Sequence, residues 1–176
     1  MEKHEHAGKG AGSFVDVDKV ISLILDKGGA FLDVGCGPGD YLESAARLTK
    51  DITGIDSDPK SIETVKSRGF RGILADVTKG IPLKDGSVDS VLLSNVLHGF
   101  VLEKTEGEAL PEIRRVLKSR GRLGIVEFKK DSAIGPPYGV KLSESQLASV
   151  LADYGFREAS RHDVGRFSYL IIFMKS

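Results

Sequence analysis

The sequence predicts one doubly wound α/β domain: a mostly parallel, seven-stranded sheet with helices on both faces and an antiparallel last strand. Along most of the 176 residues, short apolar runs alternate with segments whose apolar residues recur at helical spacing. Such alternation is typical of a parallel sheet that is covered on both faces. No helical segment separates the final two apolar runs, 159–164 and 167–174. These two strands are therefore expected to pair antiparallel at one edge of the sheet.

The first half of the chain is expected to contain three strands and three helices. Residues 1–13 are polar and glycine-rich without periodicity, which indicates a flexible tail before a domain over 14–176. Asp16 and Asp58 are suited to cap helices, and Pro59 occupies a first helical position, where its missing N–H does no harm. The expected elements are a helix from 17, a strand over 30–34, a helix over 41–48, a strand over 52–56, a helix from 59 and a strand over 70–75.

The second half is expected to contain four strands and two helices. Ser143 and Gln146 have the spacing of a capping box, and Gly155 is placed to end the helix that they begin. Pro111 interrupts the other helical stretch, which is therefore expected to start late or to kink. The expected elements are a strand over 88–94, a helix around 110–117, a strand over 122–128, a helix from 144 and the two final strands.

Composition and charge exclude several classes of protein. The 25 basic and 25 acidic residues cancel, so no global field draws the chain to nucleic acid or to an anionic membrane surface. No apolar run approaches the roughly 20 residues of a membrane span, and no signal-peptide pattern is present. The single cysteine, Cys36, excludes an intrachain disulfide and a zinc site of several thiolates. We therefore expect a cytoplasmic protein and assign no metal site.

The strongest motif is a glycine loop between the first strand and the next helix, with the sequence FLDVGCGPGD over residues 31–40. Glycines at this place permit a tight turn and let a ligand approach the backbone closely. A dinucleotide-binding loop has glycine where this chain has Asp40. The carboxylates of Asp33 and Asp40 disfavour a pyrophosphate and favour a cationic ligand. A nicotinamide-dependent oxidoreductase is therefore the disfavoured alternative.

Acidic residues also stand at the ends of three successive predicted strands, at Asp33, Asp56 and Asp76. Asp56 follows the glycine loop by about 20 residues, where doubly wound folds place an acid that binds ribose hydroxyls. Because the carboxyl ends of parallel strands meet at one edge of a sheet, we expect the three side chains to line the same crevice. A helix cap explains any one of them, but the set predicts a nucleoside site.

In this order, the motifs resemble those of class I S-adenosylmethionine-dependent methyltransferases, in particular the group that includes the ubiquinone and menaquinone biosynthesis methyltransferases. The resemblance extends from about residue 30 to 174. It rests on the runs FLDVGCGPGD, GIDSDPKSIE, ADV, IPLKDGSVDSVLLSNVLH and LPEIRRVLKSRGRLGIVEF. It implies a Rossmann-like domain that binds S-adenosylmethionine and releases S-adenosylhomocysteine after in-line displacement of the methyl group.

The resemblance also implies which residues hold this donor. The glycine loop would surround the methionine part, with Cys36 as a small filler residue. Asp56 would bind the ribose hydroxyls with Ser57 close to the adenine, and Asp76 would bind the adenine amino group with Val77 against the ring. The expected donor-binding residues are Asp33, Gly35, Cys36, Gly37, Gly39, Asp56, Ser57, Asp76, Val77, Ser94 and Asn95.

The methyl acceptor is not identified by the sequence. His98, just past the fourth strand, is the candidate general base, and packing beneath the donor is the alternative role for it. A small-molecule acceptor leads, a protein or RNA acceptor is second, and an inactive S-adenosylmethionine-binding module is the remaining alternative. Only residues 130–142 separate the fifth strand from the next helix, so we expect an open mouth, closed by the N-terminal segment or by the second subunit of a homodimer.

Overall fold

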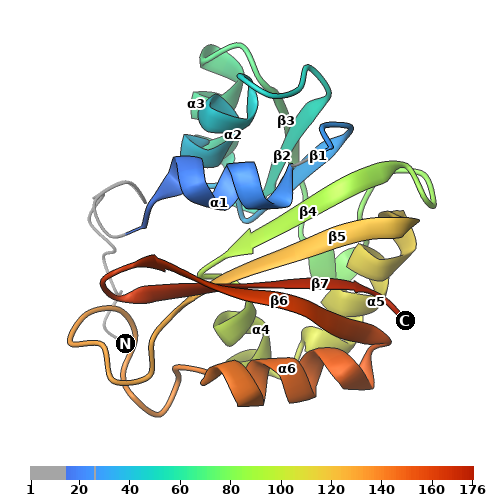
Figure 1. The fold of residues 1–176 in the computed structure, drawn as a ribbon. Helices are drawn as coiled ribbons and strands as arrows, with labels where there is room; N and C mark the ends of the chain where they lie inside the picture. The colour runs from blue at the N-terminus through green and yellow to red at the C-terminus, as the bar shows by residue number, and fades with distance from the viewer. Residues whose placement is uncertain (1–14, 26) are drawn as a thin grey trace.

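A computed structural model describes residues 15–25 and 27–176, and the predicted tail over residues 1–13 lies outside them. The described residues form one seven-stranded sheet in the order β3-β2-β1-β4-β5-β7-β6 (Figure 1). Strands β1 to β5 pair in parallel, and β7 is antiparallel to both of its neighbours. The strands are β1 (Phe31–Val34), β2 (Ile52–Asp56), β3 (Arg71–Leu74), β4 (Val88–Ser94), β5 (Leu117–Phe128), β6 (Phe156–Gly165) and β7 (Ser168–Lys175). The predicted fold class is therefore confirmed.

Helices cover both faces of this sheet (Figure 1). One face carries α1 (Val17–Ile24), α2 (Asp40–Ala45) and α3 (Pro59–Ser67). The other face carries α4 (Leu97–Glu103), α5 (Glu106–Val116) and α6 (Glu144–Asp153). A short 3₁₀ helix, η2 (Val77–Lys79), follows β3.

The core consists of two apolar clusters, one on each face of the sheet. The four residues of β1 are all buried, because this central strand has helices above and below it. Along it, Leu32 and Val34 belong to the cluster on the α5 side, and Phe31 to the cluster on the α1 side. The remaining position on the α1 side is Asp33, a carboxyl group at 1% exposure. An ionisable residue at such a place in a central strand is unfavourable for folding and needs a functional reason.

Three predicted helix starts, those of α1, α3 and α6, are confirmed by their caps. The side chains of Asp16 and Asp58 accept hydrogen bonds from the first-turn amides of α1 and α3. Ser143 and Gln146 form the complete capping box at the start of α6. The expectation of a late start at Pro111 is wrong, because α5 begins at 106 and contains the proline in its interior. Helix α4 was not predicted at all.

Strand order reverses between β1 and β4, since β2 and β3 continue on one side and β5 on the other. In doubly wound sheets a ligand crevice opens at this point, outside the carboxyl ends of the strands. The carboxyl ends of β4 and β5 point to the left in Figure 1. The glycine loop follows β1 at the same edge.

Candidate functional site

The glycine loop is folded tightly against the end of β2. The backbone amides of Gly35 and Cys36 both donate to the Ile55 carbonyl, at 2.8 and 3.0 Å. Gly35 has φ of 69°, and a Cβ there would lie 2.5 Å from Cγ2 of Val96. Gly37 has φ of 51°, and no atom of the described residues lies within 4 Å of its Cβ position, so the loop backbone is open there. A ligand can therefore approach the backbone closely at Gly37.

Asp56, at the end of β2, bonds to the glycine loop directly. Its Oδ2 accepts from the Gly37 amide at 2.8 Å, and its Oδ1 accepts from the Asp58 amide at 2.8 Å. A carboxylate has about four lone-pair sites, so both oxygens can accept further bonds from a diol. The side chain thus joins β2, the loop and the start of α3 at one point.

Two buried oxygens at this edge have no donor. Four buried side-chain atoms in the described part of the chain lack a hydrogen-bond partner, and two of them are Asp33 Oδ2 and Asn95 Oδ1. Asn95 follows β4 with φ of 57°, an uncommon conformation for a residue other than glycine. Burial, reinforced by the nearby charges of Asp56 and Asp40, raises the pKa of Asp33 to about 8. A site with two unpaired oxygens and an uncompensated carboxyl group is suited to a ligand that carries a positive charge and N–H donors.

Beside the loop lies a cavity of about 100 Å³ that collects residues from β1, β2, the segment after β3, and α4 with the residue before it. Among the residues lining it are Gly35, Asp56, Ser57, Asp76, Val77, Val96 and Phe100. The first five were predicted from the sequence, whereas Val96 and Phe100 were not. Neither residue carries a signal in the sequence, because Phe100 lies on the unpredicted helix α4 and Val96 is the residue before that helix.

Asp76 is held by the backbone and side chains that follow it. Its Oδ1 accepts from the amide and hydroxyl of Thr78, at 3.1 and 2.7 Å, and its Oδ2 lies 3.2 Å from Lys79 Nζ. The hydrogen bonds from Thr78 and Lys79 lower the pKa of the Asp76 carboxyl below its ordinary value. Asp76 therefore lines the cavity as an anion that accepts hydrogen bonds.

Ser94, at the end of β4, and Cys36, within the loop, are both withdrawn from solvent to different extents. Ser94 Oγ is 2.9 Å from the hydroxyl of Tyr41, which is 4% exposed and lies in α2. Cys36 is a free, buried thiol whose pKa is raised by burial and by the charges of Asp33 and Asp56. Because the thiolate is the reactive form, this environment makes Cys36 a poor nucleophile.

His98 lies on the β5 side of α4 and is paired with a residue that the sequence did not single out. Its Nδ1 is 2.8 Å from Oε2 of Glu127, and its backbone amide donates to Oε1 of the same side chain at 3.0 Å. The Glu127 side chain is 2% exposed and the His98 side chain 18%. Glu127 could have been singled out from the sequence, since it is the only carboxylate within the apolar stretch 123–128.

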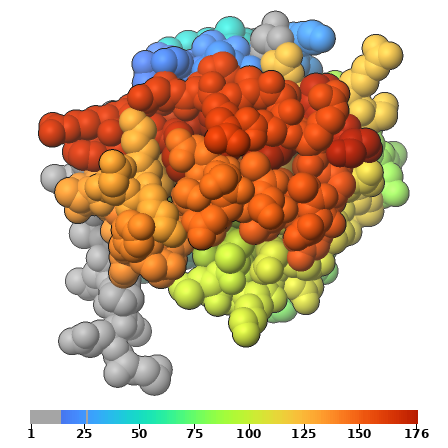
Figure 2. Space-filling model, turned by 60° about the horizontal axis from the view of Figure 1, so that its bottom comes forward, coloured from blue at the N-terminus to red at the C-terminus, as the bar shows by residue number. Residues whose placement is uncertain are grey.

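The segment over 129–142 is held by hydrogen bonds within itself and by a hydrogen bond to α6. Lys130 Nζ donates to the Lys141 carbonyl and to Gln146 Oε1, each at 3.0 Å, and Lys141 Nζ donates to the Ser132 carbonyl. Tyr138, 68% exposed, stacks on Lys130 with its ring centre 4.9 Å from Nζ. Figure 2 shows this segment, in light orange, packed beside α6.

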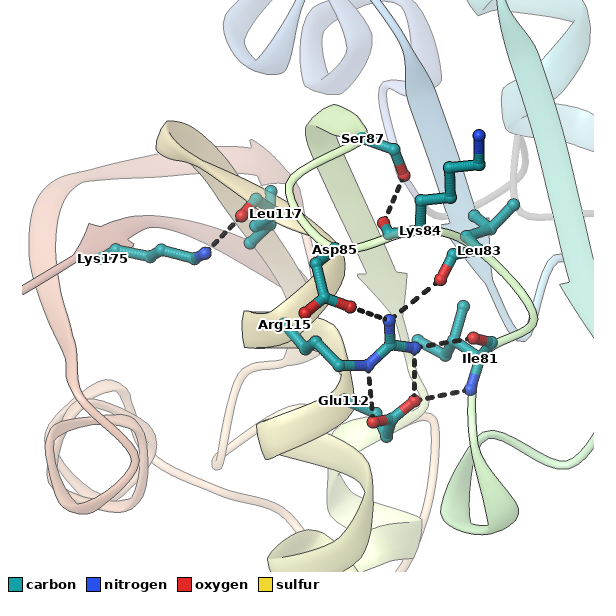
Figure 3. Close-up of polar contacts among 9 residues, drawn as sticks. All are labelled: Ile81, Leu83, Lys84, Asp85, Ser87, Glu112, Arg115, Leu117 and Lys175. Atoms are coloured by element: carbon teal, nitrogen blue, oxygen red, sulfur yellow. Dashed lines mark hydrogen bonds and ion pairs between the residues drawn. The ribbon is translucent and has the colours of Figure 1, made fainter.

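Two larger hollows lie away from the glycine loop. One, of about 370 Å³, is bounded by α1, β6 and β7. The other, of about 330 Å³, opens at the amino ends of β1 to β4, and Leu83 and Lys84 contribute to its wall. Arg115 fixes that wall, because its guanidinium bonds to Glu112, to Asp85 and to the carbonyls of the 81–87 loop (Figure 3). Neither hollow contains a predicted site residue.

Within residues 15–25 and 27–176, no three His, Cys, Asp or Glu side chains gather closely enough to hold a metal ion. In the same part of the chain, no helix has the length and apolar character needed to cross a membrane.

Comparison with known proteins agrees with this geometry. Residues 32–125 match a family described as "Methyltransferase domain". A methyltransferase-like protein of Schizosaccharomyces pombe is 32% identical over 125 residues, which cover 69% of this chain and 46% of that protein. The demethylmenaquinone methyltransferase of Tropheryma whipplei is 32% identical over 119 residues, which cover 66% and 48%. The chain thus spans less than half the length of these curated relatives.

Among solved structures, a SAM-dependent methyltransferase from Aquifex aeolicus superposes with a TM-score of 0.80 and 27% identity. The match covers 93% of this chain and 91% of that one. The family match takes in the glycine loop, the strand-end acids and His98. From these findings we conclude that the chain belongs to the methyltransferase domain family and has the fold of an S-adenosylmethionine-dependent methyltransferase.

Proposed function

We propose that the protein binds S-adenosylmethionine at the carboxyl edge of its sheet and transfers the methyl group to a small-molecule acceptor. The observation that carries this proposal is the pair of buried, unpartnered oxygens, Asp33 Oδ2 and Asn95 Oδ1, beside the glycine loop. The methionine part of the donor carries an ammonium and a sulfonium, which would supply N–H donors and positive charge there. An uncompensated pair of oxygens is costly unless a ligand satisfies it.

The remaining site residues fit the other parts of the donor. The open backbone at Gly37 leaves room for the chain that links sulfur to ribose. Asp56 would accept the ribose hydroxyls while it keeps its bonds to the Gly37 and Asp58 amides. Asp76 would accept from the adenine amino group, with Val77 and Phe100 as apolar walls of the cavity.

When bound, the donor supplies an electrophilic methyl group on a sulfonium. The protein's task is then to align an acceptor atom with the carbon–sulfur bond, because displacement occurs in line. Ser94 and Asn95 stand at the end of β4, beside the expected position of that bond. His98 lies in the first turn of α4, beside Glu127 of β5, where it would take a proton from the acceptor.

A small acceptor is favoured over a polyanion by the charge of the chain, whose 25 basic residues are balanced by 25 acidic ones. Similarity to a demethylmenaquinone methyltransferase supports the same choice.

Calorimetric titration of the purified protein tests donor binding. We expect S-adenosylmethionine and S-adenosylhomocysteine to bind more tightly than a nicotinamide dinucleotide, which serves as the control for a generic nucleotide crevice. Tighter binding of the dinucleotide would refute the assignment. Transfer of a labelled methyl group to a panel of metabolites, with RNA and protein fractions in parallel, then identifies the acceptor class. Donor binding without transfer to any of the three classes would favour an inactive binding module.

A further inference from the structure

The pairing of His98 with Glu127 determines which nitrogen of the imidazole carries the proton. Glu127 has one partner residue in the described part of the chain, since both of its oxygens bond to His98. As a carboxylate it is purely an acceptor, so the hydrogen of the short contact sits on His98 Nδ1. The neutral ring then has a lone pair on Nε2.

That second nitrogen is free to accept. Nε2 forms no hydrogen bond with any described residue, and it is not among the buried unpartnered atoms, so it reaches solvent. Tyr169 faces Glu127 across the β5–β7 pair but donates its hydroxyl to the Leu142 carbonyl at 2.8 Å. It therefore does not compete with His98 for the carboxylate.

Capping of α4 explains only half of this arrangement. Val96, the residue before α4, provides no side-chain cap, and Glu127 Oε1 substitutes for one by accepting from the His98 amide. A cap requires one oxygen. The second oxygen is directed at the ring and has no part in capping.

We propose that Glu127 is a positioning residue that holds His98 with its proton on Nδ1, so that Nε2 serves as a general base and the acceptor is a protic nucleophile such as a hydroxyl or thiol. This inference rests on the proposed methyl transfer. It narrows the acceptor to molecules whose reacting atom carries a proton, and excludes tertiary amines and thioethers.

In the proposed reaction, the acceptor loses a proton to His98 and gains the methyl group of the donor. The acceptor's proton moves to His98 Nε2, and the electron pair that it leaves forms the bond to the methyl carbon. The carbon–sulfur bond of the donor breaks, and its electron pair stays on the sulfur of S-adenosylhomocysteine. The positive charge passes from the sulfonium to the imidazolium, beside Glu127, and the proton is later released to water.

Glu127→Gln tests the pairing because it preserves shape and the cap. The amide oxygen can still accept from the His98 backbone, but the NH₂ group can only donate to Nδ1, which forces the ring proton onto Nε2. In long-range ¹H–¹⁵N spectra of the full chain, taken where imidazole is neutral, we expect His98 as the Nδ1–H form in the wild type and the Nε2–H form in the variant. His162, bonded to Ser160, is the internal reference in the same spectra.

With a phenol or thiol acceptor, turnover of Glu127→Gln is expected to fall about 10²- to 10⁴-fold, while calorimetric affinity for S-adenosylhomocysteine stays unchanged. Glu106→Gln, which alters a partly buried carboxylate with no bond to His98, is the matched control. An Nε2–H ring in the wild type, full turnover in the variant, or transfer only to atoms without a proton would overturn the proposal. Absence of donor binding would refute the proposed function instead, and the tautomer spectra would still report the pairing.

Discussion

Replacing the buried carboxyl group of Asp33 with an amide is expected to stabilise the ligand-free protein and to weaken donor binding. Asp33 is 1% exposed in the central strand, and its Oδ2 has no donor among the described residues. Burial and the charges of Asp56 and Asp40 raise its pKa from 3.8 to about 8. In the unfolded chain the same carboxyl group has an ordinary pKa. Between pH 3.8 and about 8, ionisation of Asp33 therefore favours the unfolded chain over the folded one.

The size of the stability change follows from the difference between the pKa values of Asp33 in the folded and unfolded states. The folded-state pKa of Asp33 is raised, so the protonated side chain contributes to the free energy of unfolding. This contribution is complete below about pH 4 and is lost as the pH rises toward 8. The two pKa values differ by about 4 units at about 1.4 kcal/mol per unit, which sets an upper limit near 6 kcal/mol for the full loss. Between pH 5 and pH 7 the wild type should lose about 3 kcal/mol relative to Asp33→Asn.

Urea unfolding of both proteins over this pH range measures the difference. Asp131→Asn, at an exposed position, is the control, and its stability should follow that of the wild type. Parallel curves for Asp33→Asn and the wild type would show that the carboxyl group is not held protonated, and the reasoning from burial would fail.

Asp33→Asn should also weaken S-adenosylmethionine binding by about 1.5–3 kcal/mol, roughly 10- to 100-fold, because it removes a charge-assisted hydrogen bond to the donor's ammonium.

Three further substitutions test other parts of the site. Asp56→Ala should weaken S-adenosylhomocysteine binding about 10- to 100-fold by calorimetry, since it removes the acceptor for the ribose hydroxyls, and an unchanged Kd would show that its role is misassigned. Gly35→Ala should lower the free energy of unfolding by about 1–3 kcal/mol, because the new Cβ meets Val96 at 2.5 Å, and an unshifted urea midpoint would contradict this clash. Arg115→Met should cost about 1–3 kcal/mol, as it removes the guanidinium that donates to Glu112 and to the carbonyls of Ile81 and Leu83. The part due to Glu112, whose pKa Arg115 lowers to about 2, should disappear as the pH falls from about 4.5 to 2; a pH-independent difference would argue against that ion pair.

Local signals in the sequence were sufficient for most elements of the fold. The caps at Asp16, Asp58 and Ser143 are made within a few residues of themselves, so a short window of sequence contains both partners. Helix α4 lacks such a signal, because its cap comes from Glu127 on β5, 29 residues away. Pro111 was misleading, since its missing N–H and fixed φ gave a local reason to start the helix later than it does.

The sequence by itself determined the alternation of strands and helices, the glycine loop and the acids at three strand ends, because parallel strands bring their carboxyl ends to one edge whatever their order. It placed Asp33 and His98 at the carboxyl edge of the sheet, but it did not predict their burial or their hydrogen-bond partners. Only the tertiary structure decided that Asp33 is buried, with its Oδ2 lacking a donor among the described residues, and that His98 is held by Glu127. The reason is physical: burial and hydrogen-bond partners depend on side chains from several strands and helices, which are adjacent in space and distant along the chain.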